Sequence, residues 1–178
     1  IVPYWKSIVS VPENSKLLEV GCGRGAGAVV LFRAFKAGRV DGFDIDADMV
    51  MKAKSYLSDD EFAGVINVDV GDVTRIAADN GTYDAVFDFF TLCHVEEWER
   101  GVSEISRVLK PGGYFAFCEV YDNLTRNYIV RHIFTNTLSE RFNRQSFVRC
   151  LAENGLRLME RKFNLWGYGI ISAAKKVC

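Results

Sequence analysis

Residues 16–27 read Lys-Leu-Leu-Glu-Val-Gly-Cys-Gly-Arg-Gly-Ala-Gly, a short apolar run that passes directly into a cluster of glycines. The apolar run predicts a buried β-strand at 16–20, and the glycines predict a tight turn that leads into a helix at 25–36. Glycines at such a turn adopt conformations that other residues rarely adopt, and they let a ligand lie against bare main chain. The stretch therefore predicts a strand, a ligand-binding turn and a helix.

The same alternation continues along the chain. Further strands are predicted at 39–44, 64–70, 83–88 and 114–120, with helices at about 46–56 and 96–109. The Lys-Pro-Gly-Gly sequence at 110–113 predicts a helix stop followed by a turn. Two last strand-like runs, 156–163 and 168–174, lie too close together for a helical crossover, so we expect them to pair antiparallel at one edge. The pattern predicts an α/β fold, a doubly wound and mostly parallel sheet with helices on both faces.

Composition places few further limits on the chain. Its 178 residues are 49% hydrophobic and 25% charged, which suits one globular domain over 1–178. A formal net charge of -1 gives no overall attraction for nucleic acid or for an anionic membrane, and no apolar run is long enough to span a bilayer. The five cysteines form no C-x-x-C pair, so we expect free thiols and a cytoplasmic protein. Two histidines without ligand spacing argue against a metal site, and the oligomeric state is left open.

No leader pattern opens the chain, and Ile1 in place of Met suggests a trimmed start.

Acidic residues stand at the carboxyl ends of the predicted strands, where open α/β sheets bind their ligands. Glu19 precedes the glycines, Asp44 ends the second strand, Asp72 follows the third and Asp88 ends the fourth. A carboxylate at Asp44 suits the two hydroxyls of a ribose, and Asp72 suits the amine of an adenine. The sequence therefore predicts a nucleoside-binding pocket with an acidic lining.

Two cofactors remain candidates for this pocket. Residues 21–26 match the dinucleotide fingerprint G-x-G-x-x-A, with Asp44 on the ribose of NAD, which would make the protein an oxidoreductase. A pyrophosphate, however, favours positive surroundings, whereas a sulfonium with an ammonium group favours carboxylates such as Glu19. The acidic series thus favours S-adenosylmethionine, with Ile45 and Val73 placed to enclose its adenine ring.

Four motifs, taken in order, resemble those of class I, Rossmann-like S-adenosylmethionine-dependent methyltransferases. They are 17–25, 41–46 (Asp-Gly-Phe-Asp-Ile-Asp), 83–87 (Tyr-Asp-Ala-Val-Phe) and 105–113 (Ile-Ser-Arg-Val-Leu-Lys-Pro-Gly-Gly). The last motif, together with Leu-Cys-His-Val at 92–95, is similar to the small-molecule branch that includes the quinone-biosynthesis methyltransferases. The resemblance implies a seven-stranded sheet of order 3-2-1-4-5-7-6 with strand 7 antiparallel, and S-adenosylmethionine lying across strands 1 to 3.

The predicted cofactor contacts combine the acidic series, the glycine turn and the neighbours of the adenine. They are Glu19, Gly21, Cys22, Gly23, Arg24, Gly25, Asp44, Ile45, Met49, Asp72, Val73, Asp88 and Phe89. We expect the methyl group to lie beside Phe89, Phe90 and His94, because these residues follow strand four. His94 is the one imidazole near this reaction centre, and it is either a general base or acceptor contact, or a residue that starts the next helix.

The predicted reaction is the in-line transfer of a methyl group from S-adenosylmethionine to an O, N, S or C atom of a small molecule, leaving S-adenosylhomocysteine. Residues 88–91 read Asp-Phe-Phe-Thr and lack the N/D-P-P-Y/F pattern of enzymes that methylate base amines, so no nucleic-acid partner is expected. The segment 121–154 is predicted to form amphipathic helices over the substrate, although its arginines and aromatic residues also fit nucleic-acid binding. An NAD-type oxidoreductase and a non-catalytic S-adenosylmethionine-binding protein remain alternatives.

Overall fold

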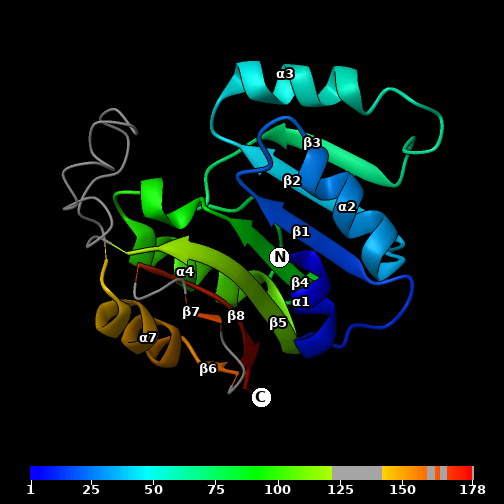
Figure 1. Cartoon of the computed structure of the whole chain (residues 1–178). Coiled ribbons are helices and arrows are strands. Elements are labelled where there is room, and N and C mark those ends of the chain that lie inside the picture. The colour runs from blue at the N-terminus through cyan, green and yellow to red at the C-terminus, as the bar shows by residue number, and fades with distance from the viewer. Residues whose placement is uncertain (122–141, 160–162, 165–167, 178) are drawn as a thin grey trace.

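The computed structural model describes residues 1–121, 142–159, 163–164 and 168–177 (Figure 1). In chain order its elements are α1 (Val2–Ile8), β1 (Lys16–Val20), α2 (Ala26–Phe35), β2 (Arg39–Asp44), α3 (Ala47–Tyr56), β3 (Ile66–Val70), β4 (Tyr83–Phe89), the 3₁₀ helix η1 (Leu92–His94), α4 (Trp98–Val108), β5 (Leu109–Val120), α7 (Arg144–Glu153), β6 (Leu156–Leu158), β7 (Phe163–Asn164) and β8 (Gly169–Lys176).

The strands form one sheet of order β3-β2-β1-β4-β5-β8-β6, and the two-residue β7 pairs with β8 beside this path. Neighbours from β3 to β5 are parallel, whereas β8 is antiparallel to both β5 and β6. Since β8 is the seventh strand of the prediction, the predicted order 3-2-1-4-5-7-6 is confirmed. The parallel strands β1 to β4 therefore end at one edge of the sheet, where the predicted site lies.

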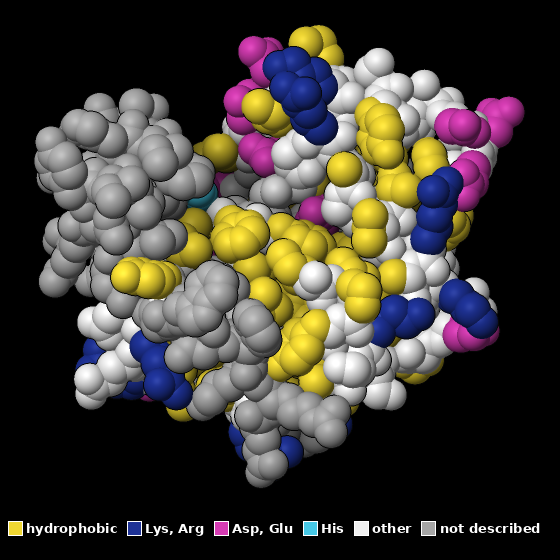
Figure 2. Space-filling view, viewed as in Figure 1, with side chains coloured by type: hydrophobic (Ala, Val, Ile, Leu, Met, Phe, Trp, Pro, Cys, Tyr) yellow, Lys and Arg dark blue, Asp and Glu magenta, His cyan; other side chains and the backbone are white. Residues whose placement is uncertain are grey.

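Helices cover both faces of the sheet (Figure 1). One buried cluster joins α1, α2 and α3 to side chains such as Leu17 and Phe87, and the other joins α4 and α7 to side chains such as Leu18 and Phe117. Alternate residues of each strand thus serve opposite cores, as buried strands require. In the space-filling view, hydrophobic side chains gather across the middle of the face, and most charged side chains lie around them (Figure 2).

Local signals place most helix ends where the sequence predicts them. Asp46 caps α3, because its side chain accepts hydrogen bonds from the backbone N–H groups of Asp48 (2.8 Å) and Met49 (3.4 Å). Gly25, with φ of 82°, leads into α2, and Lys36, with φ of 49°, ends it. The turns that carry the candidate site are therefore fixed by capping as well as by packing.

The structure corrects the prediction of a separate turn at 110–113. These residues lie within β5, whose pairing with β4 passes from Tyr83 opposite Leu109 to Ala85 opposite Tyr114, so the intervening residues form a bulge. The Lys110 Nζ atom lies 2.7 Å from Asp84 Oδ1 and ties this bulge to β4. Pro and Gly are typical of turns and of bulges alike, and here the neighbouring strand decides between them.

The predicted strand at 156–163 is shorter and divided, with β6 over Leu156–Leu158 and β7 over Phe163–Asn164. The antiparallel edge itself is confirmed by the pairing of both with β8.

The predicted lid at 121–154 lies partly outside the described residues, which omit 122–141. Its described part includes α7, which begins with a capping box between Asn143 and Ser146 and buries Phe147, Cys150 and Leu151. This helix shares the core cluster of α4, so it is part of the domain core. The function of the segment as a lid stays a prediction.

Of the helices that the structure describes, none combines the length and the hydropathy needed to cross a membrane.

Candidate cofactor site

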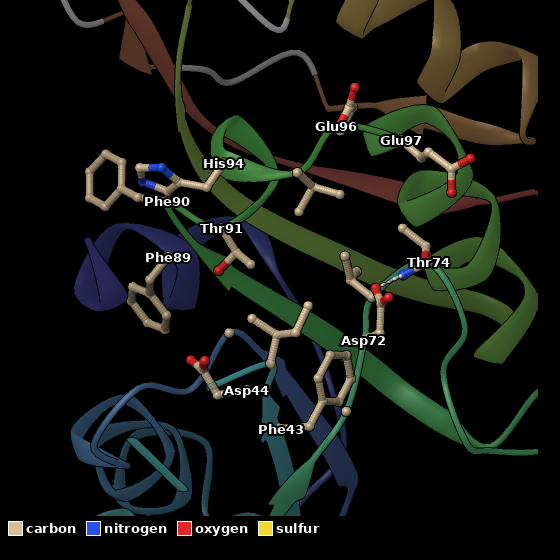
Figure 3. Close-up of a pocket in the computed structure, with 15 residues that line it drawn as sticks. Phe43, Asp44, Asp72, Thr74, Phe89, Phe90, Thr91, His94, Glu96 and Glu97 are labelled. Carbon is tan, nitrogen blue, oxygen red and sulfur yellow. Dashed lines mark hydrogen bonds between the residues drawn. The ribbon is translucent and has the colours of Figure 1, made fainter. Parts of the chain in front are cut away.

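A cavity of about 560 Å³ lies at the carboxyl ends of β1, β2, β3 and β4 (Figure 3). Eight of the predicted site residues line it, namely Gly21, Asp44, Ile45, Asp72, Val73, Phe89, Phe90 and His94. The other lining residues are Phe43, Gly71, Thr74, Thr91, Val95, Glu96 and Glu97. The structure therefore brings together residues from four separate turns, as the positions of the strand ends predict.

Asp44 joins two of these turns. Its Oδ2 atom accepts a hydrogen bond from the backbone N–H of Gly23 (2.9 Å), and its Oδ1 atom accepts one from Asp46 (3.0 Å). A carboxylate oxygen accepts two hydrogen bonds, so each oxygen still has an acceptor site. Asp44 can therefore hold the glycine turn in place and receive the hydroxyls of a ribose in the cavity.

Replacing Asp44 with Ala is expected to weaken binding of S-adenosylhomocysteine by at least about tenfold, because charged hydrogen bonds contribute about 1.5–3 kcal/mol each. Isothermal titration calorimetry measures this change. Asp69→Ala is the matched control, since Asp69 carries the same charge on β3 but pairs with Lys54 at the surface. An affinity of Asp44→Ala that stays within about twofold of wild type would contradict this role.

Gly21 forms the floor of the cavity beside Thr91. Its φ of +64° favours glycine, and a Cβ atom there would overlap the side chain of Thr91. The Thr91 hydroxyl donates a hydrogen bond to the carbonyl of Val20 (3.0 Å). The loop after β4 therefore lies directly against the glycine turn, which leaves no room for a side chain at position 21.

Glu19 lies behind this floor, and only 3% of its surface is exposed. A Cβ atom on Gly27 would overlap the Glu19 carboxyl group, so α2 approaches β1 closely here. Burial, followed by the charge of Asp88 and then that of Asp44, raises the pKa of Glu19 from 4.5 to about 8, although a hydrogen bond from the Ala28 backbone opposes the shift. Its Oε2 atom has no hydrogen-bond partner among the described residues. A cationic donor on a ligand would satisfy this oxygen.

The turn after β3 presents Asp72 and Val73 to the cavity. Asp72 Oδ1 accepts a hydrogen bond from the Thr74 backbone N–H (2.8 Å), drawn as a dashed line in Figure 3. Val73 is 4% exposed, whereas Ile45 on the opposite turn is 74% exposed. Both side chains line the cavity, and apolar side chains from two turns suit a flat ring, as predicted for the adenine.

Seven predicted contact residues are not among those that line the cavity: Glu19, Cys22, Gly23, Arg24, Gly25, Met49 and Asp88. Most of them shape the turns from behind. Cys22 is 5% exposed and packs against β2, and Asp88 is fully buried and accepts a hydrogen bond from the Thr91 backbone N–H (2.8 Å). Contact between these residues and a cofactor stays a prediction.

Thr91 and Glu119 were not predicted to belong to the site, and the backbone of Phe90 was not predicted to be unusual. Phe90 lines the cavity with a φ of +63°, a conformation that is rare for a residue with a bulky side chain. Glu119 is fully buried at the end of β5. The one available signal was the carboxyl group of Glu119 at the end of an otherwise apolar strand, Phe-Ala-Phe-Cys-Glu-Val at 115–120.

Acidic side chains dominate the electrostatics of the cavity. Asp44, Asp72, Glu96 and Glu97 line it, and its described lining includes no Lys or Arg. A pyrophosphate would be repelled there, whereas the sulfonium and ammonium groups of S-adenosylmethionine would be attracted. The residues present therefore fit S-adenosylmethionine, which supplies an electrophilic methyl group when bound, better than they fit NAD.

Curated relatives are similar to this chain over about 60% of its length. It is 33% identical to the sterol 24-C-methyltransferase of Kluyveromyces lactis over 61% of this chain and 29% of that protein. It is 31% identical to the fatty-acid O-methyltransferase of Mycolicibacterium smegmatis over 60% of this chain and 38% of that protein. The match thus spans about a third of the length of these relatives.

A solved structure shows the same fold over nearly the whole chain. The geranyl diphosphate C-methyltransferase of Streptomyces coelicolor superposes with a TM-score of 0.86 at 18% identity, covering 99% of this chain and 79% of that one. None of these three proteins is named as a quinone-biosynthesis enzyme, so that finer resemblance stays a prediction. The family described as methyltransferase domain matches residues 18–117, which include most of β1, the cavity turns and most of β5. The chain therefore belongs to the methyltransferase domain family.

Proposed function

We propose that this chain transfers the methyl group of S-adenosylmethionine to a small-molecule acceptor. The observation that supports this most directly is the acidic cavity at the ends of β1 to β4, with the unpartnered Glu19 oxygen behind it. In this proposal Asp44 binds the ribose hydroxyls, Asp72 binds the adenine amine, and Glu19 receives the ammonium group.

The side chains of this chain would contribute alignment and the exclusion of water. A sulfonium is an excellent leaving group, so catalysis requires mainly an acceptor held in line with the methyl group. Phe89, Phe90 and Thr91 lie on the side of the cavity that follows β4, and His94 lies beside Phe90 (Figure 3). We propose that this side faces the acceptor and that His94 contacts it or removes a proton where the accepting atom carries one.

The acceptor in this proposal is largely apolar. Aromatic side chains at the β4 side of the cavity, Phe89 and Phe90, present no charge to it, and the relatives include enzymes named for sterols and fatty acids. A quinone ring with an apolar tail belongs to the same chemical class. We also propose a cytoplasmic location, because the four described cysteines are free thiols.

The test is incubation of the chain with S-adenosylmethionine labelled in the methyl group and a panel of a sterol, a fatty acid, an isoprenoid diphosphate and a quinone precursor. We expect label in the organic extract with at least one of them, and less label with Asp44→Ala when S-adenosylmethionine is below saturation. Binding of S-adenosylhomocysteine without label in any acceptor would instead support a non-catalytic S-adenosylmethionine-binding protein.

A further inference from the structure

Two carboxyl groups that the proposed reaction does not use are buried at the ends of β4 and β5. Asp88 and Glu119 are each 0% exposed, and their carboxyl groups lie close enough for the pKa of each to depend on the other. The ion pairs of the described residues include neither of them. Two carboxylates only accept hydrogen bonds, so a hydrogen bond between these neighbouring groups requires one shared proton.

The same two groups hold three consecutive backbone N–H groups of the loop after β4. Asp88 Oδ1 accepts from Thr91 (2.8 Å), Glu119 Oε1 accepts from Leu92 (2.8 Å) and Glu119 Oε2 accepts from Cys93 (3.1 Å). Three hydrogen bonds to buried carboxyl oxygens therefore fix the backbone at the start of η1.

This loop forms one side of the cavity through Phe90, Thr91 and His94. Phe90 is held in a left-handed conformation, with φ of +63°, and its backbone N–H donates to the carbonyl of Cys118 (2.9 Å). Such a conformation is unfavourable for a residue with a side chain and persists only where surrounding bonds impose it. Asp88 lies two residues before Phe90, and Glu119 follows Cys118, the hydrogen-bond partner of Phe90. The bonds from Asp88 and Glu119 therefore help to hold the Phe90 backbone in this conformation.

We propose that Asp88 and Glu119, sharing one proton, are positioning residues that hold the loop 90–94 as the acceptor-side wall of the cavity. The part of this inference that concerns the acceptor rests on the proposed function. The part that concerns the loop is a property of the protein without any ligand.

The geometry predicts different effects for amide substitutions of the two residues. Asp88 Oδ2 has no hydrogen-bond partner among the described residues and is where the proposal places the shared proton, so in Asp88→Asn an amide N–H can replace that proton while Oδ1 still accepts from Thr91. Both oxygens of Glu119 accept backbone N–H groups, so in Glu119→Gln the amide donor must face one of them. Asn at 88 therefore preserves the network, and Gln at 119 breaks it.

The arrangement also makes the loop sensitive to alkaline pH. Glu19 from β1 and the Cys93 thiol from η1 act on the pair, and both bring negative charge when ionised. Burial and the charge of Asp88 raise the pKa of Glu119 well above its usual value, so the shared proton is kept at neutral pH. When it is lost, two adjacent buried carboxylates repel each other and the loop is released, except in Asp88→Asn, which has no such proton.

Amide hydrogen exchange of residues 91–93 tests this in the whole chain without ligand, at neutral and alkaline pH and corrected for intrinsic rates. In wild type we expect protection at neutral pH and a loss of about tenfold or more at alkaline pH. In Glu119→Gln the protection of these amides should be lower by about tenfold or more at both pH values. In Asp88→Asn the protection should be retained at both pH values. Asp84→Asn is the control, since Asp84 lies on the same strand but binds Lys110 and the Lys16 backbone.

The inference is overturned if wild type and Asp88→Asn lose protection at the same pH, or if Glu119→Gln protects these amides as wild type does. If Glu119→Gln does not fold, the pH dependence of amide protection in wild type and in Asp88→Asn is sufficient to test the inference. The affinity for S-adenosylhomocysteine, measured on the same samples, should fall about fivefold or more in Glu119→Gln and not in Asp84→Asn. If the wild-type chain does not bind S-adenosylhomocysteine, the proposed function is overturned. The hydrogen-exchange measurement without ligand still tests the role of Asp88 and Glu119 in that case.

Discussion

Gly21→Ala is expected to lower the affinity for S-adenosylhomocysteine by about a hundredfold or more. The new Cβ atom would overlap the side chain of Thr91, which must then leave the carbonyl of Val20 and move into the cavity. The left-handed backbone at φ of +64° adds a cost of about 1–2 kcal/mol for any residue other than glycine. Overpacking adds about 1–3 kcal/mol, so the free energy of unfolding should also fall by several kcal/mol.

Gly23→Ala is the matched control for this variant. Gly23 has a similar φ of +52°, but a Cβ atom there meets no other atom within 4 Å. It therefore carries the backbone cost without the overlap, and calorimetry should show a much smaller loss of affinity. Equal losses in the two variants would mean that backbone conformation, and not the contact with Thr91, restricts position 21 to glycine.

The second large effect concerns pH. The free energy of unfolding of the ligand-free chain should fall as pH rises toward about 8, because the pKa of Glu19 is raised to about 8 in the folded state from 4.5. A raised carboxyl pKa stabilises the fold fully below the unfolded value, and this stabilisation is lost as pH rises through the folded value. Each pH unit in this window corresponds to about 1.4 kcal/mol, so the total reaches several kcal/mol.

Urea unfolding at a series of pH values measures this slope. In Glu19→Gln the free energy of unfolding should depend less steeply on pH than in wild type, because the contribution of Glu19 is removed. The contribution of Asp88 and Glu119, which has the same sign, should remain. Glu13→Gln should keep the full slope, since Glu13 is exposed and pairs with Lys36 at the surface. Parallel slopes for wild type and Glu19→Gln would show that Glu19 is ionised at neutral pH.

Much of the fold could be predicted because the strands of a parallel sheet are apolar runs bounded by turn residues. Strands β1 and β2 begin and end at the predicted residues, and the Asp46 cap was visible as a residue type. The bulge at 110–113 could not be predicted, because Pro and Gly fit a turn equally well and only the pairing with β4 decides. The short β7 gives too few residues to form a pattern.

The candidate site divides in the same way. Asp44 and Asp72 could be placed because they follow strands whose ends must meet at one edge of the sheet. The role of Glu119 could not be predicted, because its hydrogen-bond partners Leu92 and Cys93 lie 27 and 26 residues away in the sequence. Only the tertiary fold brings them together. The conformation of Phe90 gave no signal, because its left-handed backbone is imposed by tertiary hydrogen bonds and not by its residue type.

Calorimetric titration of the wild-type chain with S-adenosylhomocysteine and, separately, with NAD tests the central claim most directly. The claim is that the acidic cavity at the ends of β1 to β4 is built for the cofactor of methyl transfer. We predict saturable binding of S-adenosylhomocysteine at one site, retained in Gly23→Ala far better than in Gly21→Ala, and no saturable binding of NAD. Saturable binding of NAD without binding of S-adenosylhomocysteine would contradict the account.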